Sequence, residues 1–308
     1  MTDQPFPAPG TTDIALSVRT HDRAGERRVD AAWLAETWAD LASRIVPIAG
    51  TRLPVSEDGD QVRWHRSDEL PSQGSQGLQG LQIFLGMRED IAHFALVVDE
   101  PTDEGRWATF REVLQGLSEP DAGFMVHAVA LAEWHASHRF CPRCGGPLEA
   151  SAAGHVMVCR QCGRQQFPRS DPAVIMMVTD GDRALLGRQD RWPEGRYSTL
   201  AGFVDPGESL EEAVVREVAE ETGVRVTDVT YYGNQPWPFP QSLMIGFFAR
   251  AETTEIHVDQ HEISDARWFT REELKAQAEA GTLVLPGGIS ISRSLVEAWY
   301  GGPLPGQW

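Results

Sequence analysis

The sequence predicts a mixed α+β and α/β protein in three parts: an N-terminal α+β domain over residues 1–134, a small four-cysteine ribbon over 135–168, and a C-terminal α/β domain over 169–308. Three observations predict this organisation. The chain has 308 residues, which exceeds the roughly 100–200 residues of one typical domain. All four cysteines fall in one short segment. After that segment, strand-like and helix-like patterns alternate, as in layered α/β domains.

The N-terminal part is expected to fold, but it shows no recognisable chemistry. Residues 1–12 are rich in proline and are expected to be disordered. Asp30 to Ile45 has helical periodicity, and apolar side chains including Trp33 and Leu41 recur on one face. Pro71 to Gly80 is rich in Gly, Gln and Ser and predicts a mobile loop. The other expected elements are strands at 62–66, 81–85 and 91–98 and a helix at about 122–139.

The C-terminal part shows the alternation most clearly. Short apolar runs rich in β-branched residues predict strands, and the segments between some of them have helical periodicity. The expected strands are 173–178, 183–187, 198–204, 226–233, 243–251 and 266–269, and the expected helices are 209–221, 271–280 and 289–300.

The chain is acidic, with 45 Asp and Glu against 27 Lys and Arg and a net charge of −18. Such a surface repels phosphate on average, so the charge argues against broad binding to nucleic-acid backbone. The N-terminus has no basic and apolar signal-peptide pattern. No apolar run approaches the roughly 18 residues of a membrane span. We therefore expect a soluble, cytoplasmic protein with no membrane partner.

The cysteines form two CxxC pairs, Cys141 with Cys144 and Cys159 with Cys162. Two CxxC turns on a hairpin would close a tetrahedral four-thiolate site, which suits structural Zn²⁺ because no coordination position stays open. The alternatives are four free buried cysteines or a redox pair. We expect the nearby histidines to be helix residues and not ligands: His135 and His138.

The ribbon segment is also the basic part of the chain, with four bases and one acid between residues 141 and 169. Zinc ribbons often bind nucleic acid. However, four thiolates and one Zn²⁺ together carry a charge of −2, so little positive charge remains. This is too little for affinity built on phosphate neutralisation.

The most informative stretch is 202–224, which holds seven acids and one base. Ser209 and Glu212 have the spacing of a capping box, and Gly223 can end a helix. The stretch therefore predicts a helix over 210–222.

Three glutamates share one side of that helix: Glu217, Glu220 and Glu221. Like charges at this spacing repel, so the cluster is poor design for stability alone. It is reasonable if divalent cations such as Mg²⁺ or Mn²⁺ bind there, because these ions prefer carboxylate oxygen. Arg216 can pair with one carboxylate and fix its rotamer. The alternative is a solvated acidic helix face.

This stretch resembles the Nudix box, G-x5-E-x7-R-E-U-x-E-E-x-G-U, where U is apolar. The matching residues are Gly202, Glu208, Arg216, Glu217, Val218, Glu220, Glu221, Gly223 and Val224. The resemblance implies a Nudix α/β/α sandwich for the C-terminal domain. It also implies Mg²⁺- or Mn²⁺-dependent hydrolysis of a nucleoside diphosphate linked to another group.

A second motif, N-Q-P-W-P-F-P-Q-S, runs from Asn234 to Ser242. Its alternating prolines predict a rigid, extended segment. This would hold Trp237 and Phe239 as stacking surfaces for bases. The alternative is a proline-rich edge loop whose aromatic side chains plug the core.

Ribbon, box and this motif together resemble the bacterial NADH pyrophosphatase (NudC-type) family over about residues 134–296. One departure is Asn234, where the family motif usually begins with Ser. The resemblance implies a homodimer in which the N-terminal region takes part. It also implies one structural Zn²⁺ per chain on Cys141, Cys144, Cys159 and Cys162, and more than one catalytic Mg²⁺ or Mn²⁺ per site.

The resemblance also implies roles for single residues. Glu217, Glu221 and Glu262 would bind the catalytic metals, with help from the carbonyl of Ala201. Glu220 would be a further ligand or a base, and Arg216 completes the catalytic set. The implied substrate-binding residues are Phe167, Phe203, Gln235, Pro236, Trp237, Pro238, Phe239, Pro240, Gln241, Ser242 and Ser292.

The expected reaction is hydrolysis of the pyrophosphate bond of NADH or NAD⁺ to nicotinamide mononucleotide and AMP. Either Glu220 or Glu221 would be the general base. The same chemistry would remove an NAD cap from the 5′ end of RNA. The alternatives are hydrolysis of ADP-ribose or another nucleoside diphosphate derivative, and a non-catalytic nucleotide sensor.

Overall fold

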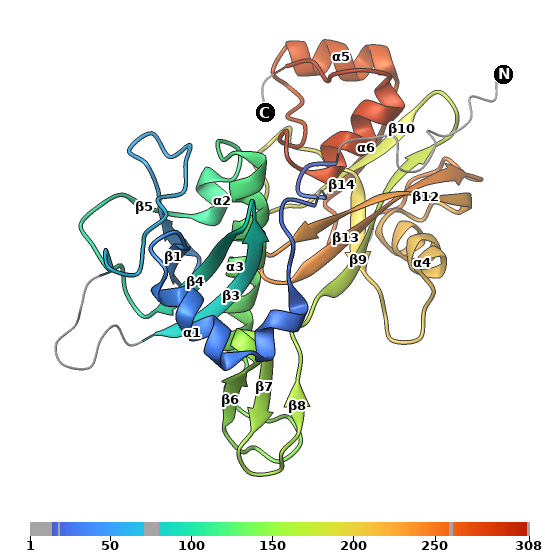
Figure 1. Cartoon of the computed structure of the whole chain (residues 1–308). Helices are drawn as coiled ribbons and strands as arrows, with labels where there is room; N and C mark the ends of the chain where they lie inside the picture. Colours follow the sequence, from blue (N-terminus) through green and yellow to red (C-terminus); the bar gives the residue numbers. More distant parts are fainter. Residues whose placement is uncertain (1–13, 18, 71–79, 259–260, 307–308) are drawn as a thin grey trace. The chain divides into compact units, whose positions relative to one another are not determined.

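A computed structural model of the chain describes residues 14–17, 19–70, 80–258 and 261–306 (Figure 1). The segment expected to be disordered, 1–12, and most of the expected loop at 71–80 lie outside the described residues. The chain forms two compact units. The N-terminal unit comprises the described residues from 19 to 170 together with Pro238–Gln241, and the C-terminal unit comprises the remainder. The division into three domains at 134 and 168 stays a prediction.

The N-terminal unit contains a five-stranded sheet with the order β3-β4-β1-β2-β5. Strands β1 and β4 run parallel, and the other neighbours are antiparallel. The strands are Arg44–Ala49 (β1), Arg52–Pro54 (β2), Leu81–Arg88 (β3), Ile91–Val98 (β4) and Trp107–Thr109 (β5). The helices are Gly25–Val29 (η1, a 3₁₀ helix), Ala31–Ala39 (α1), Phe110–Val113 (α2) and Glu119–Ser137 (α3).

The expected helix over Asp30 to Ile45 is wrong in its second half. Asp30 caps α1 through the backbone N–H of Trp33, as a helix start requires, but α1 ends at Ala39. A turn follows, in which the Ser43 backbone N–H donates to the Asp40 carbonyl. Ile45 then enters β1, pairs with β4 and is fully buried. A sheet partner more than forty residues away therefore overrides the local helical pattern.

The expected strand at 62–66 is also wrong. This segment makes only two isolated bridges, Val55 to Val62 and Ile45 to His65. Trp64 uses its indole N–H to bind Asp121 on helix α3 at 2.9 Å.

The ribbon lies within the N-terminal unit as a three-stranded antiparallel sheet, β6-β7-β8. Its strands are Leu148–Ser151 (β6), Val156–Cys159 (β7) and Gln165–Gln166 (β8), with a short 3₁₀ helix at Ala152–Gly154 (η3). Gly145 and Gly163 follow the second cysteine of each pair and have φ of 72° and 69°. Their backbone N–H groups donate to the carbonyls of Cys141 and Cys159. Each CxxC pair thus sits on a tight turn.

The C-terminal unit contains a six-stranded sheet with the path β12-β13-β9-β10-β14, and β11 pairs with β9 beside this path. Only β13 and β9 run parallel among these pairs. The strands are Asp171–Thr179 (β9), Ala184–Arg188 (β10), Leu200–Phe203 (β11), Val226–Trp237 (β12), Ser242–Ala251 (β13) and Asp265–Phe269 (β14). The helices are Leu210–Thr222 (α4), Arg271–Glu279 (α5) and Ile291–Tyr300 (α6).

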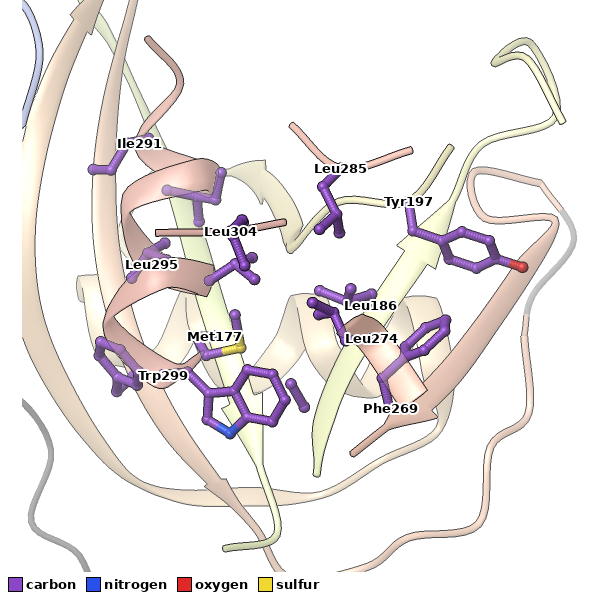
Figure 2. Close-up of a cluster of buried hydrophobic side chains, with 14 of the residues drawn as sticks. Met177, Leu186, Tyr197, Phe269, Leu274, Leu285, Ile291, Leu295, Trp299 and Leu304 are labelled. Carbon is purple, nitrogen blue, oxygen red and sulfur yellow. The ribbon is translucent and has the colours of Figure 1, made fainter. Parts of the chain in front are cut away.

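Helices cover both faces of this sheet. Val214 and Val218 of α4 pack with Val174 and alternate residues of β9 on one face. Ile291 and Leu295 of α6 pack with Met177 on the other face, where Trp299 and Leu304 complete the cluster (Figure 2). The alternation of side chains along β9 explains why one strand serves two cores. The C-terminal unit is thus the expected α/β/α sandwich. No helix among the described residues has the length and apolar character needed to cross a membrane.

Candidate active site

Helix α4 places the acidic cluster, and its ends are set by local sequence. The Ser209 hydroxyl accepts the backbone N–H of Glu212 at 3.2 Å, and the Glu212 carboxylate accepts the backbone N–H of Ser209 at 2.9 Å. Gly223 adopts φ 70° and ends the helix. The predicted bounds of 210–222 are confirmed.

Three glutamates converge at this helix: Glu217, Glu221 and Glu262. Each offers one carboxylate oxygen, and the three oxygens lie within 4.8 Å of one another. Glu217 is 6% exposed and Glu221 is 3% exposed, and burial raises the pKa of Glu217. Buried carboxylates are costly unless they are paired or bind metal. Three convergent hard oxygen donors are the ligands that Mg²⁺ and Mn²⁺ prefer, so the residues present fit a divalent ion.

Gly202 makes room for this cluster. A Cβ atom at Gly202 would lie 1.9 Å from the carboxyl carbon of Glu217. Strand β11 can therefore approach helix α4 only because residue 202 has no side chain. The neighbouring residue, Ala201, lines the same cavity as Glu217 and is the residue whose carbonyl is expected to help bind metal.

Arg216 holds the carboxylates around it. Its guanidinium contacts Glu208 at 2.6 and 2.8 Å, Glu217 at 2.8 Å and Glu220 at 2.9 Å, and it also donates to the carbonyl of Phe203. The hydrogen bonds between Arg216 and Glu208 lower the pKa of Glu208 to about 2 and raise the pKa of Arg216. The sequence predicts one partner for Arg216, and the structure supplies three carboxylates.

Glu220 lies outside the three-glutamate cluster, although it is on the same helix. Its side chain is 61% exposed and pairs with Arg216. The structure therefore separates Glu220 from the buried pair, Glu217 and Glu221. The role of Glu220, as a further metal ligand or as a base, stays a prediction.

These groups open into a cavity of about 810 Å³ within the C-terminal unit. The sequence identified seven of its lining residues: Ala201, Gly202, Phe203, Arg216, Glu217, Glu221 and Glu262. The structure adds other polar and apolar lining residues: Ala173, Gln189, Asp190, Arg191, Asp205, Met244 and His261. Asp190 and Arg191 follow β10, and no local pattern marks them. The signal for Asp205 was its place inside the acidic box.

The predicted substrate-binding residues lie in several environments. Phe203 is 61% exposed and lines the cavity. Phe167 is 62% exposed and lies in the N-terminal unit. Phe239 also belongs to the N-terminal unit, where it stacks on Phe110 and lies beneath the guanidinium of Arg111. None of the residues from 235 to 242 is among those that line the cavity.

Two of the predicted substrate-binding residues are buried inside the C-terminal unit. Ser292 is 2% exposed, and its hydroxyl bonds to the hydroxyls of Ser198 and Thr199, each at 2.8 Å. Gln235 is 1% exposed, and its side-chain amide bonds to three backbone groups among the described residues. The substrate role of Gln235 and Ser292, like that of the other motif residues from Pro236 to Ser242, stays a prediction.

The four cysteines of the ribbon also converge. Their sulfur atoms lie within 4.8 Å of one another. Cys141 Sγ is 3.8 Å from Cys162 Sγ, and Cys144 Sγ is 3.5 Å from Cys159 Sγ. His135 donates instead to the carbonyl of Gly154 at 2.7 Å, so the cluster consists of thiols alone. This donor set fits a closed structural zinc site.

Three family models match successive parts of the chain. They describe an NADH pyrophosphatase-like rudimentary NUDIX domain over residues 42–134, an NADH pyrophosphatase zinc ribbon domain over 136–167, and a NUDIX domain over 169–284. The fold and the glutamate cluster of the C-terminal unit are thus those of the Nudix class. The first match also covers a region in which the sequence showed no resemblance and no chemistry.

Curated relatives resemble most of the chain. The NAD-capped RNA hydrolase NudC of Stutzerimonas stutzeri is 40% identical, covering 77% of this chain and 81% of the relative. The protein of the same name from Mycobacterium bovis is 41% identical, over 70% of this chain and 74% of the relative. The NAD-capped RNA hydrolase NUDT12 of Macaca fascicularis is 44% identical, over 90% and 71%. The chain belongs to the NADH pyrophosphatase (NudC-type) family of Nudix hydrolases.

Proposed function

We propose that this protein hydrolyses the pyrophosphate bond of NADH and NAD⁺ to nicotinamide mononucleotide and AMP, and that it removes the NAD cap from RNA 5′ ends. The observation that carries the proposal is the three-glutamate cluster at the wall of the 810 Å³ cavity. The names of the curated relatives, NAD-capped RNA hydrolases, support the choice of substrate.

Glu217, Glu221 and Glu262 would hold the catalytic ions, Mg²⁺ or Mn²⁺ and more than one per site, with the carbonyl of Ala201. Ions bound there would offset the charge of the pyrophosphate and lower the pKa of a water molecule. Arg216 keeps Glu217 in one rotamer, because its guanidinium bonds to Glu217, Glu220 and Glu208 at once. This fixed arrangement would let the carboxylates bind the divalent ions without first reorganising.

The reaction adds water across one P–O–P linkage. A new P–O bond forms at one phosphorus, the bond from that phosphorus to the bridging oxygen breaks, and the other phosphate leaves. A carboxylate accepts the water proton. The two candidates for this base are Glu220, which is exposed and pairs with Arg216, and Glu221, which lines the cavity and belongs to the three-glutamate cluster. Phe203 offers an exposed aromatic face on the same cavity, where a base can stack.

The rest of the proposal concerns the assembly. The ribbon would hold one structural Zn²⁺ per chain on its four cysteines. The chain would act as a cytoplasmic homodimer of three-domain subunits, with the 234–242 motif and Phe167 contributing to nucleotide binding. The net charge of −18 favours recognition of the RNA end and its first nucleotides over binding along the RNA.

A substrate panel tests this function. The purified protein is incubated with Mg²⁺ or Mn²⁺ and, separately, NADH, NAD⁺, ADP-ribose and NAD-capped RNA, and products are identified by mass spectrometry. We expect nicotinamide mononucleotide and AMP from the dinucleotides, and 5′-monophosphate RNA from the capped RNA. Water labelled with ¹⁸O identifies which phosphorus is attacked.

Controls separate the rival functions. Faster hydrolysis of ADP-ribose than of either dinucleotide would favour a general nucleoside diphosphate hydrolase. Binding of nucleotides with no turnover in either metal would favour a sensor. A series of capped RNAs of increasing length should show equal affinity, and a steep rise with length would contradict recognition of the end alone. Zinc content is measured in each sample, so that loss of activity through an unfolded ribbon is recognised.

A further inference from the structure

The turn at Ile14–Ser17 is part of the C-terminal unit, although it precedes the whole N-terminal unit in the sequence. The Ser17 backbone N–H donates to the Ile14 carbonyl at 3.1 Å and closes the turn. Ile14 is 6% exposed and belongs to the hydrophobic cluster beneath α6. A Cβ atom at Gly233 on β12 would lie 2.2 Å from the Ile14 side chain, so this strand carries glycine where Ile14 rests.

Gln235 connects this turn to helix α6. Its Nε2 donates to the carbonyls of Ala15 at 2.8 Å and Ile289 at 2.7 Å. Its Oε1 accepts the backbone N–H of Ile291, the first residue of α6, at 2.9 Å. The side chain is 1% exposed, and both N–H donors and the acceptor are used. Its orientation is therefore fixed, because reversing the amide would place oxygen against two carbonyls.

The sheet register connects Gln235 to the active-site cavity through directly paired residues on neighbouring strands. Gln235 pairs with Met244 across β12 and β13, Met244 pairs with Ala173 on β9, and Ala173 pairs with Phe203 on β11. Met244, Ala173 and Phe203 all line the cavity. Directly paired residues of neighbouring strands point to the same face of a sheet. Gln235 is thus one strand away from the cavity wall and on the same face.

We propose that the Ile14–Ser17 turn and Gln235 form a positioning clamp for the active-site cavity. The clamp fixes the start of α6 and the end of β12, and through Met244 it sets the wall against which the substrate binds. Gln235 would then contribute to nucleotide binding as a positioning residue that acts through Met244, in place of the direct substrate contact that the family resemblance implies. This inference rests on the proposed dinucleotide hydrolysis, and it assigns part of the substrate-binding apparatus to the first turn of the chain that the structure describes.

Substitutions at two distant points test the clamp. Gln235→Glu keeps the size of the side chain but replaces the Nε2 amide group, which donates two hydrogen bonds, with a carboxylate oxygen that faces the carbonyls of Ala15 and Ile289. Ile14→Ala removes the side chain packed over Gly233. We expect each to raise the KM for NADH roughly tenfold, the effect of one lost buried hydrogen bond or packing contact, with kcat within about twofold of wild type. Val29→Ala, at a position that is 79% exposed in the N-terminal unit, should leave KM unchanged.

Amide hydrogen exchange gives a second readout that needs no turnover. In both test variants, the amides of residues 289–295 and 235–237 should exchange faster, while the ribbon amides in β6 and β7 stay as in wild type. Unchanged exchange and unchanged KM would overturn the clamp. Faster exchange with unchanged KM would show a purely structural contact and also overturn the positioning role.

The two proposals fail in different ways. If the wild-type protein hydrolyses no dinucleotide, the proposed function is wrong, and the clamp cannot position a substrate for it. Hydrogen exchange would still show whether the turn and Gln235 hold the start of α6. If wild type is active and Gln235→Glu does not fold, Ile14→Ala decides the outcome through its KM.

Discussion

Helices α3 and α4 show how differently two helices of one chain are used. Helix α3, in the region that matches a rudimentary NUDIX domain, buries ten residues, all apolar except His127. Its acids, Glu119, Asp121 and Glu133, are not among them. Helix α4 buries six residues, and two of these are Glu217 and Glu221. Each helix packs beside a mixed sheet with one parallel strand pair, so the buried carboxylates, and not the architecture, distinguish the candidate catalytic unit.

The largest effect should come from Glu221→Gln on α4. The change removes one anionic ligand while keeping the shape. Because even residues that only support a metal ligand cost 10–100-fold when mutated, we expect turnover to fall by at least about a hundredfold. The thermal midpoint should be unchanged or higher without divalent metal, since one buried like charge is gone.

The matched control is Glu133→Gln on α3, which should change neither turnover nor stability measurably. Kinetics with NADH and calorimetry check both variants. Near-normal turnover in Glu221→Gln would remove the basis for assigning the metal site to α4.

A smaller effect should follow from Gly202→Ala. The added Cβ would meet the Glu217 carboxylate, so that carboxylate must move. A displacement of about 1 Å at a reacting group can cost on the order of a hundredfold in rate. We expect a loss up to that size and weaker activation by Mg²⁺, measured as the metal concentration at half-maximal turnover. Gly302→Ala, which places a Cβ in open space, is the control. Equal kinetics for the two variants would show that β11 does not constrain Glu217.

The comparison also extends to pH. Burial lowers the pKa of His21, His93 and His155 in the N-terminal unit to about 4 and lowers that of His127 as well. In the unfolded chain these histidines have a pKa near 6.5, so between about pH 6.5 and pH 4 the unfolded state binds more protons than the folded state. The N-terminal unit should keep its full stability above about pH 6.5 and lose it progressively towards pH 4.

Urea unfolding at pH 7 and pH 5, monitored through hydrogen exchange of the α3 amides, measures this loss. The urea concentration at the midpoint of unfolding should be lower at pH 5. His127→Gln should weaken the pH dependence, because one buried titrating group is gone. His257→Gln, at an exposed position of the C-terminal unit, should not. A midpoint independent of pH in the wild type would mean that these imidazoles are solvated more than their burial indicates.

The sequence predicts the parts of this molecule that local chemistry determines. Helix α4 has the predicted ends because its start and stop signals, Ser209 with Glu212 and then Gly223, lie within the helix itself. The convergence of four cysteines follows from spacing alone. Glu262 could be assigned only through the family resemblance, because it lies forty residues beyond the helix that it joins.

Long-range pairing determines what could not be predicted. Ile45 fits a helix locally, and only its pairing with Phe94 in β4 makes it a strand residue. Met244 enters the cavity because β13 lies beside β9, which no local pattern reveals. The motif predicts a substrate role for Gln235 but not its burial, because the groups that its side-chain amide binds, at Ala15, Ile289 and Ile291, lie far away in the sequence.

The contact between Ala15 and Gln235 has a consequence for how the chain is made. The two residues are 220 positions apart. At 5–20 residues per second, a ribosome takes roughly 10 to 45 s between them. During that time the residues from 19 to 170, which form most of the N-terminal unit, emerge and can fold before the strand that covers the first turn has been made. A nascent chain released before Gln235 is made would therefore expose Ile14, because the finished C-terminal unit joins an early and a late segment of the polypeptide.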